Sequence, residues 1–313
     1  MTFACMGIDL GSTTAKSVVV DGDGNVLGAQ VVQMGAVSRK GLEKSMEGAL
    51  SQSGLAFEDI RSTIGTGYGR RLVPGAGRTF TEITCHARGV AALVPGVRLV
   101  IDIGGQDSKA ILVNDEGLVD KFAMNDRCAS GTGRFFDVVA RALEVSMDEL
   151  GPLALSGAED LEISSMCATF AETEIIALMA EGRDPADIAA SVHRAISARA
   201  LGLVAQVGRH TPAVLTGGVA RNAAAVKFMS EALGEELIVP ADPQVTGAFG
   251  AALLAVETET KGFVFQGDVS KLDAVEHEVE SSFRIENRAV PECSTCSGGP
   301  VPVTLGRGPS LTV

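Results

Sequence analysis

The chain has 313 residues, of which 46% are hydrophobic and 21% charged, and its formal net charge is −13. This composition excludes a wholly disordered chain. The acidic balance disfavours binding to nucleic-acid backbones, and with one Tyr and no Trp the chain offers few aromatic rings for stacking on single strands. We therefore expect no nucleic-acid partner.

The first predicted element is a strand within MTFACMGIDLG, a segment that reaches Asp9 without a basic stretch. It lacks the pattern of a signal peptide, and no apolar run approaches the roughly 18 residues of a membrane helix. We therefore expect a cytoplasmic protein without a membrane partner. In that reducing compartment the six cysteines are candidates for metal binding, catalysis or packing rather than for disulfides.

This strand opens an internal repeat. The segment DLGSTTAK at residues 9–16 is matched by DIGGQDSK at residues 102–109, and the residues that follow keep the same offset. Each copy predicts a strand, a glycine-rich turn, a second strand, an Asp/Gly hairpin turn and a third strand. Two copies of one unit indicate two similar domains that face each other, and we place them over residues 1–95 and 96–256.

Outside the two copies, the spacing of apolar residues predicts helices, and a short apolar run before Gly217 and Gly218 predicts a strand and a tight turn. The helices are expected over residues 40–52, 131–143, 169–181, 185–207, 222–233 and 247–256, and the strand over residues 212–216. Such mixed elements indicate an α/β fold. Residues 257–313 lose this periodicity and gain Pro, Ser and Gly, so we expect a flexible C-terminal extension.

Both glycine-rich turns are candidate phosphate-binding loops. The first turn joins two strands, which excludes a P-loop and a dinucleotide-binding fingerprint, because both lead into a helix. Glycine lets backbone N–H groups approach an anion, and hydroxyl and ammonium groups add donors. The first loop consists of Gly11, Ser12, Thr13, Thr14, Ala15 and Lys16, and the second presents Asp102, Gly104, Gly105 and Gln106.

Asp9 ends the first strand, where its carboxylate is placed to hold Mg²⁺ through water, since Mg²⁺ prefers one or two carboxylates and keeps several waters. Asp102 has the equivalent place in the second copy, for the metal or for positioning water, and the sequence does not separate the two roles. The alternative for both turns is that they need glycine for geometry alone.

The paired hairpins, followed by TGGVARN at residues 216–222, resemble the actin, sugar kinase and heat-shock chaperone ATPase superfamily. A narrower resemblance is carried by GIDLGSTTAKSVVV, IGTGYGR, VIDIGGQDSKAI, MNDRCASGTGRFFDV, SSMCATFAETEII and LTGGVARN. These segments resemble the ATP-dependent activators of 2-hydroxyacyl-CoA dehydratases and the related ATPase subunits of benzoyl-CoA reductase. The resemblance spans residues 5–256 in the same order.

The resemblance implies two ribonuclease-H-like (actin-like ATPase) domains related by internal duplication, with a nucleotide cleft between them. It implies ATP or ADP with Mg²⁺ as ligands, hairpins that clasp the β- and γ-phosphates, and catalytic roles for Asp9 and Asp102. It also implies nucleotide contacts from Gly217, Gly218 and Gln244. Family members hydrolyse ATP and pass one low-potential electron, received from ferredoxin or flavodoxin, to a partner iron–sulfur dehydratase or reductase.

Family members are also homodimers with a single [4Fe-4S] cluster between the subunits, and the resemblance implies Cys128 and Cys167 as its ligands. Each of these cysteines precedes a predicted helix, whose N-terminus favours the thiolate. A cubane cluster takes four thiolates, and two chains would supply them. The alternative is a pair of inert, buried thiols. Of the other cysteines, packing is expected for Cys5 and Cys85, and Cys293 and Cys296 lie outside the resemblance.

The sequence thus predicts an ATPase coupled to electron transfer. Two other functions fit the same loops. A small-molecule kinase of the same superfamily would need no cluster, and a scaffold protein would use ATP only as a conformational ligand. The identity of the partner enzyme and the role of the C-terminal extension stay open.

Overall fold

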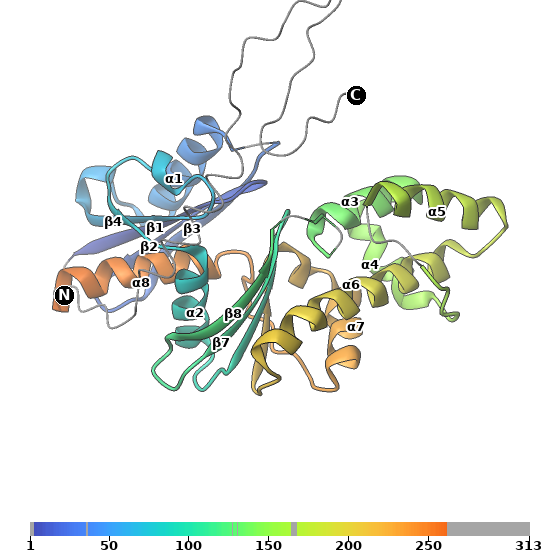
Figure 1. Cartoon of the computed structure of the whole chain (residues 1–313). Coiled ribbons are helices and arrows are strands. Elements are labelled where there is room, and N and C mark those ends of the chain that lie inside the picture. Colours follow the sequence, from blue (N-terminus) through green and yellow to red (C-terminus); the bar gives the residue numbers. More distant parts are fainter. Residues whose placement is uncertain (1–2, 36, 127, 130, 164–167, 262–313) are drawn as a thin grey trace, which may run out of the picture. The chain divides into compact units, whose positions relative to one another are not determined.

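The computed structural model describes residues 3–35, 37–126, 128–129, 131–163 and 168–261 (Figure 1). Within these ranges the chain is a mixed α/β fold with a five-stranded and a four-stranded sheet. The first sheet has the order β3-β2-β1-β4-β5, from β1 (Ala4–Leu10), β2 (Thr14–Asp21), β3 (Val26–Gln33), β4 (Ile60–Thr66) and β5 (Ala76–Thr79). The second has the order β8-β7-β6-β9, from β6 (Leu99–Ile103), β7 (Ser108–Val113), β8 (Val119–Asn125) and β9 (Ala213–Thr216).

The two sheets pair their first strands in the same way. In each, three consecutive strands form an antiparallel meander, and the first of them pairs in parallel with a later strand. The register sets Asp9 opposite Lys16 in one sheet and Asp102 opposite Lys109 in the other. The predicted strands and hairpin turns of both copies are confirmed.

The helices are α1 (Arg39–Ser53), α2 (Glu82–Leu93), α3 (Gly133–Ala142), α4 (Met147–Ser156), α5 (Ala168–Ala180), α6 (Pro185–Val207), α7 (Ala223–Leu233) and α8 (Thr246–Lys261). Capping residues determine where several of these helices begin and end. The Ser38 side chain caps α1 at its start, and Gly54, with φ 70°, ends it in the left-handed conformation that glycine adopts without strain. The predicted helices are confirmed with small shifts at their ends, whereas α2 and α4 were not predicted.

The first sheet is covered on both faces, because alternate residues of a strand point to opposite sides. Met6 and Val19 pack with α1, while Cys5 and Val18 pack with α8. The second sheet packs on α6, and the core there extends over α3, α4, α5 and α7. The helices after the second hairpin therefore build a separate core that borders the pocket described below.

The last helix, α8, was predicted within the second domain, over residues 96–256, but it packs on the first sheet. The backbone of α8 lies close to β1 and to α2. An added Cβ at Gly7 would collide with α8 backbone atoms, and one at Gly250 would collide with α2 backbone atoms. Helix α2 lies against α8 and also contributes Ile83 and Val90 to a cluster on the second sheet. Helices α2 and α8 therefore connect the two sheets, and a boundary at residue 256 cuts through α8.

Helix α6 corrects one expectation about apolar runs. Within the described ranges it is the helix long and apolar enough to cross a membrane, with a mean hydropathy of 1.2 over an 18-residue window. However, 56% of that window is buried inside the protein. Its neighbours are α4, α7 and the second sheet, so α6 has the surroundings of a core helix, a class that passes the same test.

Candidate nucleotide-binding site

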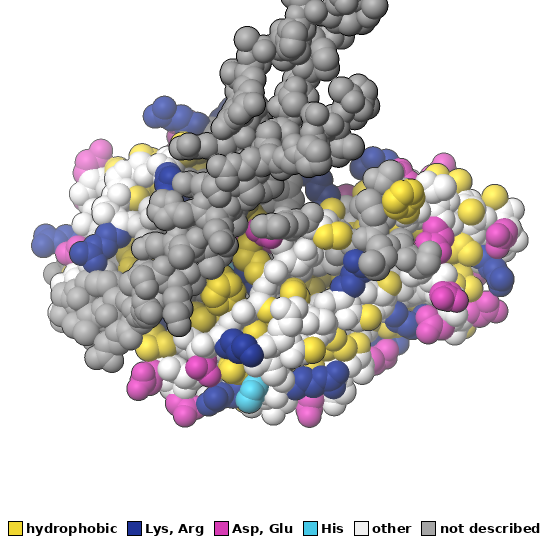
Figure 2. Space-filling model, viewed as in Figure 1, with side chains coloured by type: hydrophobic (Ala, Val, Ile, Leu, Met, Phe, Trp, Pro, Cys, Tyr) yellow, Lys and Arg dark blue, Asp and Glu magenta, His cyan; other side chains and the backbone are white. Residues whose placement is uncertain are grey.

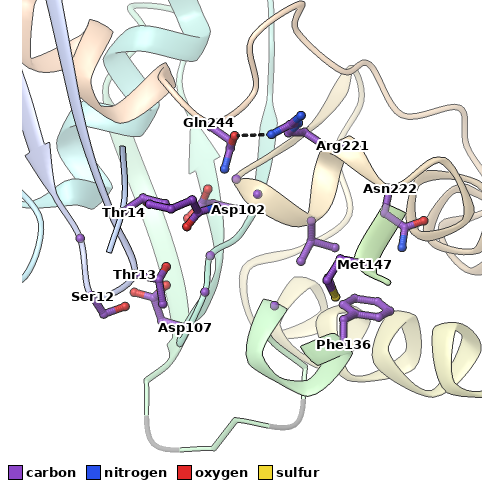
Figure 3. Close-up of a pocket in the computed structure, with 18 of the residues that line it drawn as sticks. Ser12, Thr13, Thr14, Asp102, Asp107, Phe136, Met147, Arg221, Asn222 and Gln244 are labelled. Carbon is purple, nitrogen blue, oxygen red and sulfur yellow. Dashed lines mark hydrogen bonds between the residues drawn. The ribbon is translucent and has the colours of Figure 1, made fainter. Parts of the chain in front are cut away.

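A pocket of about 560 Å³ lies where the two glycine-rich hairpins meet, and it extends to α3 and α4 (Figure 3). Most residues predicted to bind the nucleotide line it. These are Asp9, Gly11, Ser12, Thr13, Thr14, Lys16, Asp102, Gly104, Gly105, Gly217, Gly218 and Gln244. Two predicted residues do not line it, because Ala15 is buried in the core of the first sheet and the Gln106 side chain is exposed.

In the first hairpin, Asp9 is only 3% exposed and its two carboxylate oxygens differ. Lys16 Nζ donates to Oδ2 at 2.7 Å, whereas Oδ1 is buried and has no hydrogen-bond partner among the described residues. Burial alone would lower the pKa of Lys16, but the Asp9 carboxylate outweighs it and the pKa is raised. The lysine therefore stays charged beside the pocket, and one Asp9 oxygen is left for a ligand or water.

Gly67 lies directly against that oxygen at the end of β1. Its φ is +83°, and an added Cβ would collide with Asp9 Oδ1 and lie 2.7 Å from the Leu10 carbonyl oxygen. Only glycine fits this close approach and this conformation. The IGTGYGR segment, noted above as part of the resemblance, therefore wraps the end of β1.

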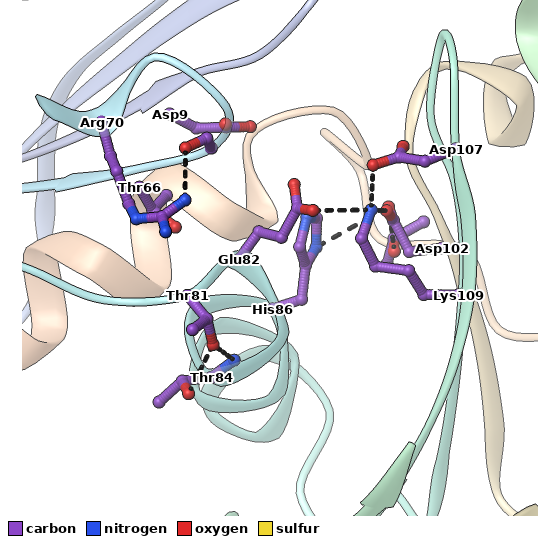
Figure 4. Close-up of polar contacts among 12 residues, drawn as sticks. Asp9, Thr66, Arg70, Thr81, Glu82, Thr84, His86, Asp102, Asp107 and Lys109 are labelled. Carbon is purple, nitrogen blue, oxygen red and sulfur yellow. Dashed lines mark hydrogen bonds and ion pairs between the residues drawn. The ribbon is translucent and has the colours of Figure 1, made fainter. Parts of the chain in front are cut away.

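In the second hairpin, both carboxylate oxygens of Asp102 have partners. Thr216 Oγ1 donates to Oδ1 at 3.0 Å, and Lys109 Nζ lies 3.2 Å from Oδ2. His86 Nδ1 is 3.7 Å from Oδ1 (Figure 4). Burial alone would raise the pKa of Asp102, but His86, Lys109 and the Thr216 hydrogen bond together lower it. Asp102 is therefore an ionised carboxylate held on every side.

Lys109 is the centre of this network, with a side chain that is 1% exposed. Its Nζ lies 2.8 Å from Asp107 Oδ2 and 3.5 Å from Glu82 Oε1, in addition to the contact with Asp102 (Figure 4). Burial alone would lower the pKa of Lys109, but Glu82, Asp102 and Asp107 raise it well above its usual value. A permanent positive charge thus lies at the wall of the pocket.

Glu82 is a pocket residue that the sequence analysis missed. It stands in the first turn of α2, directly after Thr81, whose side chain caps the helix. The carboxylate is 19% exposed, and burial raises its pKa although Lys109 acts in the opposite direction. A threonine cap followed by an acidic residue could have indicated the start of α2 at Glu82. The position of the Glu82 side chain in the pocket, however, depends on segments that are distant in sequence.

Tyr68, from the IGTGYGR segment, also lines the pocket. Its ring is half-buried, and burial, together with the charges of Asp107 and Glu82, raises the pKa of its hydroxyl. The hydroxyl is therefore protonated and is a hydrogen-bond donor at the mouth of the site.

Opposite the hairpins, the pocket has an apolar wall with amide groups beside it (Figure 3). Phe136 comes from α3, and Met147 from the start of the unpredicted helix α4. Asn222 caps α7 through Oδ1, while Arg221 donates to Gln244 Oε1 at 3.1 Å. The pocket thus combines an apolar wall with polar edges on one side and glycine hairpins that carry charged side chains on the other.

Three of the six cysteines lie within the residues that the structure describes. Cys5 and Cys85 are buried in the core cluster under α8, and burial raises their pKa to about 11 and about 12. Cys128 is half-buried just before α3. Cys167, Cys293 and Cys296 lie outside the described residues. Among the residues described, no group of three or more His, Cys, Asp or Glu side chains could hold a metal ion.

These two sheets, with a polar pocket between paired glycine hairpins, form a fold that is found in other solved structures. The ethanolamine utilization protein EutJ from Carboxydothermus hydrogenoformans shares the fold, with a TM-score of 0.53 at 16% identity over 80% of this chain and 89% of that chain. The sequence pattern of the BadF/BadG/BcrA/BcrD ATPase family matches residues 6–255, and the chain belongs to this family.

Two relatives are similar over nearly their whole length. The activator of lactoyl-CoA dehydratase from Anaerotignum propionicum is 43% identical over 82% of this chain and 98% of its own. The (R)-2-hydroxyglutaryl-CoA dehydratase activating ATPase from Acidaminococcus fermentans is 39% identical over 83% of this chain and 100% of its own.

A solved structure agrees with these relatives. The activator of 2-hydroxyisocaproyl-CoA dehydratase from Clostridium difficile, with bound ADPNP, is 38% identical and has a TM-score of 0.78, covering 85% of this chain and 100% of that one. The chain is therefore an ATPase of the activator type, as the sequence predicted, and the kinase alternative has less support.

Proposed function

We propose that the chain hydrolyses ATP in order to transfer a low-potential electron to a partner iron–sulfur enzyme. The partner would be a 2-hydroxyacyl-CoA dehydratase, a benzoyl-CoA reductase or a similar enzyme, and ferredoxin or flavodoxin the electron donor. The observation that carries this proposal is the pocket between two Asp–Lys hairpins in a chain 43% identical to a dehydratase activator. The cytoplasm is the proposed location.

In this proposal the β- and γ-phosphates lie between the two hairpins and the adenosine lies against Phe136 and Met147. The equal register of Asp9–Lys16 and Asp102–Lys109 supports both an internal duplication and a nucleotide cleft between its copies. Lys16 and Lys109 supply positive charge where the phosphates carry negative charge.

Mg²⁺ fits the first hairpin better than the second. Asp9 Oδ1 is a buried oxygen without a hydrogen-bond partner among the described residues, whereas both oxygens of Asp102 have partners. A bound Mg²⁺ would neutralise charge on the phosphate oxygens. Asp9 would hold it through water, while Asp102 would keep Lys109 in place.

Hydrolysis joins water to the γ-phosphorus and breaks the bond to the β-phosphate, giving ADP and phosphate. We assign the orientation of the attacking water to Glu82. Its carboxylate faces the pocket beside Lys109, and its raised pKa suits a group that accepts a proton from water.

The proposal includes an iron–sulfur cluster. One [4Fe-4S] cluster per homodimer, held by Cys128 and Cys167 of each chain, would supply one-electron chemistry. Helix α5 follows Cys167 directly and exposes Phe170 and Ile176 at 73% and 55%. Figure 2 shows hydrophobic side chains among charged ones over the end of the molecule that carries α5. Exposed apolar side chains on that helix support an interface there.

Analysis of anaerobically purified protein tests the proposal. We expect a brown protein with about four irons per dimer and slow release of phosphate from Mg·ATP. Cys128→Ala and Cys167→Ala should each abolish the iron content and leave nucleotide binding measurable. A colourless protein that phosphorylates a small molecule would favour the kinase, and nucleotide binding without phosphate release would favour the scaffold.

A further inference from the structure

The apolar wall of the pocket rests on a buried histidine that does not itself line the pocket. His193, in α6, is 1% exposed. Its ring lies between two phenylalanines, with its centroid 4.6 Å from that of Phe136 and 5.9 Å from that of Phe228. Of these three side chains, only Phe136 lines the pocket. The histidine therefore lies directly behind the wall that faces the hairpins.

The two ring nitrogens of His193 have different partners. Nδ1 lies 2.7 Å from the Ala189 carbonyl oxygen, and Nε2 lies 3.0 Å from Asn222 Nδ2. Because a carbonyl oxygen can only accept, Nδ1 carries a proton and donates to it. Burial lowers the pKa of the imidazole to about 4, so near neutral pH the ring is uncharged and Nε2 has no proton. Nε2 is therefore an acceptor, and Asn222 Nδ2 donates to it.

The amide of Asn222 is also held from its other side, by helix α7. Its Oδ1 accepts from the N–H groups of Ala224 at 2.9 Å and Ala225 at 3.3 Å. Turning the amide over would place Nδ2 against these N–H groups and Oδ1 against the lone pair of His193, and both contacts would be repulsive. The orientation of the amide is therefore fixed. His193 uses one N–H of Nδ2, and the second has no partner among the described residues.

This second N–H belongs to a residue that lines the pocket. Figure 3 shows Asn222, Phe136 and Met147 on the side of the pocket opposite the hairpins. An added Cβ at Gly151 would lie 2.7 Å from Asn222 Oδ1, so α4 packs closely against the oxygen of the amide. A purine base presents ring nitrogens at its edge, and those without a proton accept hydrogen bonds. The wall thus offers such a base an apolar face and one oriented donor.

We infer that His193 is a positioning residue for nucleotide recognition, which holds the Asn222 amide so that its second N–H donates to an unprotonated ring nitrogen of adenine. The inference rests on the proposed function, in which the adenosine lies against Phe136 and Met147. His193 acts through Asn222 and Phe136, because it does not reach the pocket itself. Its loss should therefore weaken binding of the base and leave the hydrolysis step at the hairpins unchanged.

Analogues of ADP test this in the full-length protein. Each of three analogues carries a C–H in place of one adenine ring nitrogen, N1, N3 or N7, and calorimetry with Mg²⁺ compares their binding with that of ADP. We expect one of the three to bind about fivefold more weakly than ADP, the loss of one neutral hydrogen bond of about 1 kcal/mol. In His193→Phe, which keeps an aromatic ring between Phe136 and Phe228, that ratio should fall to about one.

Two further variants separate positioning from packing. His193→Gln places an amide oxygen near the position of Nε2, so it should restore the preference for ADP. Asn222→Asp keeps an oxygen to cap α7 but has no N–H, so it should lose the preference, and it provides the test if His193→Phe fails to fold. Ser197→Ala is the matched control, because it removes a buried hydrogen bond to the His193 carbonyl oxygen and leaves the imidazole in place. It should keep the wild-type ratio.

Hydrolysis gives a second measurement. In His193→Phe the KM for ATP should rise about fivefold with kcat unchanged, as expected when binding is lost equally from the ground state and the transition state. A lower kcat with an unchanged KM would overturn the inference. So would equal binding of ADP and all three analogues in the wild type, or a wild-type ratio in both His193→Phe and Asn222→Asp.

These outcomes are distinct from a failure of the proposed function, because the binding measurements need neither hydrolysis nor iron. A protein that prefers ADP over one analogue but releases no phosphate from ATP would contradict the proposed function and support the inference. A protein that hydrolyses ATP but binds all three analogues as tightly as ADP would contradict the inference alone.

Discussion

The two hairpins have the same backbone but hold their carboxylates differently. Asp9 pairs with Lys16 through one oxygen and leaves the other buried without a partner among the described residues. Asp102 pairs with Lys109 and also accepts from Thr216. Equal register therefore does not imply an equal role, because the neighbours that pack on each strand end decide which oxygen stays available for a ligand.

The difference comes from segments that are distant in sequence. Thr216 reaches Asp102 from the end of β9, and His86 approaches it from α2. At the end of β1 the equivalent place is occupied by Thr66, whose hydroxyl donates to the Phe80 carbonyl oxygen instead of to Asp9. In the proposed site, the first hairpin would therefore hold metal-bound water, whereas the second holds a lysine fixed by three carboxylates.

Asp9→Asn is expected to have the largest effect of the variants that test this difference between the hairpins. Losing the charge beside the unpartnered oxygen should lower phosphate release by about 1,000-fold, the upper range for removing one electrostatic contact in a catalytic site. The response to Mg²⁺ concentration should weaken as well, and phosphate release over a Mg²⁺ series measures both. Asp21→Asn is the control, because Asp21 lies at the exposed end of β2, where it bonds Asn25. Full activity of Asp9→Asn would show that the two hairpins do not differ as described.

Asp102→Asn should act first on stability. The substitution removes one of the three carboxylates around the buried Lys109 ammonium, which costs up to about 3 kcal/mol of unfolding free energy, the upper range for a hydrogen bond to a charged group. Urea denaturation measures this, and Asp115→Asn, at an exposed turn of the same sheet, should change it little. An unchanged midpoint with lost Mg²⁺ dependence would instead assign the metal to Asp102.

Glu82→Gln should lower the turnover number by about 100-fold, the lower range for general acid–base groups, and leave ADPNP affinity unchanged. Because the ionised carboxylate is the active form and its pKa is raised, wild-type turnover should increase with pH above the usual range of a glutamate. The variant should lose that increase. Glu149→Gln provides a control in the first turn of α4. A parallel loss of affinity would indicate a structural role.

The smallest effect is expected from removing the C-terminal extension. A chain ending at Phe263, the last residue of the first compact unit, should keep ATP hydrolysis and the difference between the hairpins. The cut must follow α8, because Glu257 pairs with Arg88 and Glu259 with Arg61. Phosphate release of the truncated and full-length chains measures this. Lost activity in the shorter chain would assign the extension a role in the site.

The hairpins were predictable from sequence because turn chemistry is local. Glycine and aspartate mark the turns around Gly11 and Gly104, and alternation of apolar residues marks the strands. Most of the phosphate side of the pocket follows from these features. The flexible extension and the domain boundary at residue 95 stay predictions.

The rest of the site depends on contacts between distant segments. Helix α4 is only 10 residues long and has an internal Pro152, so its Ser146–Glu149 capping box is the main signal for it. Helix α8 is apolar on several faces, so its pattern does not indicate which sheet it covers. Glu82 and His86 enter the pocket only once α2 lies between α8 and the second sheet.

Tyr68 gives the protein an intrinsic fluorophore at its pocket. It is the single tyrosine of a chain that has no tryptophan, and it lines the pocket. The tyrosine emission of the protein, which is stronger than that of phenylalanine, therefore originates from one phenol ring beside the glycine hairpins. Occupancy of the pocket changes the polarity and the charges around that ring, so unlabelled protein carries its own optical reporter of nucleotide exchange.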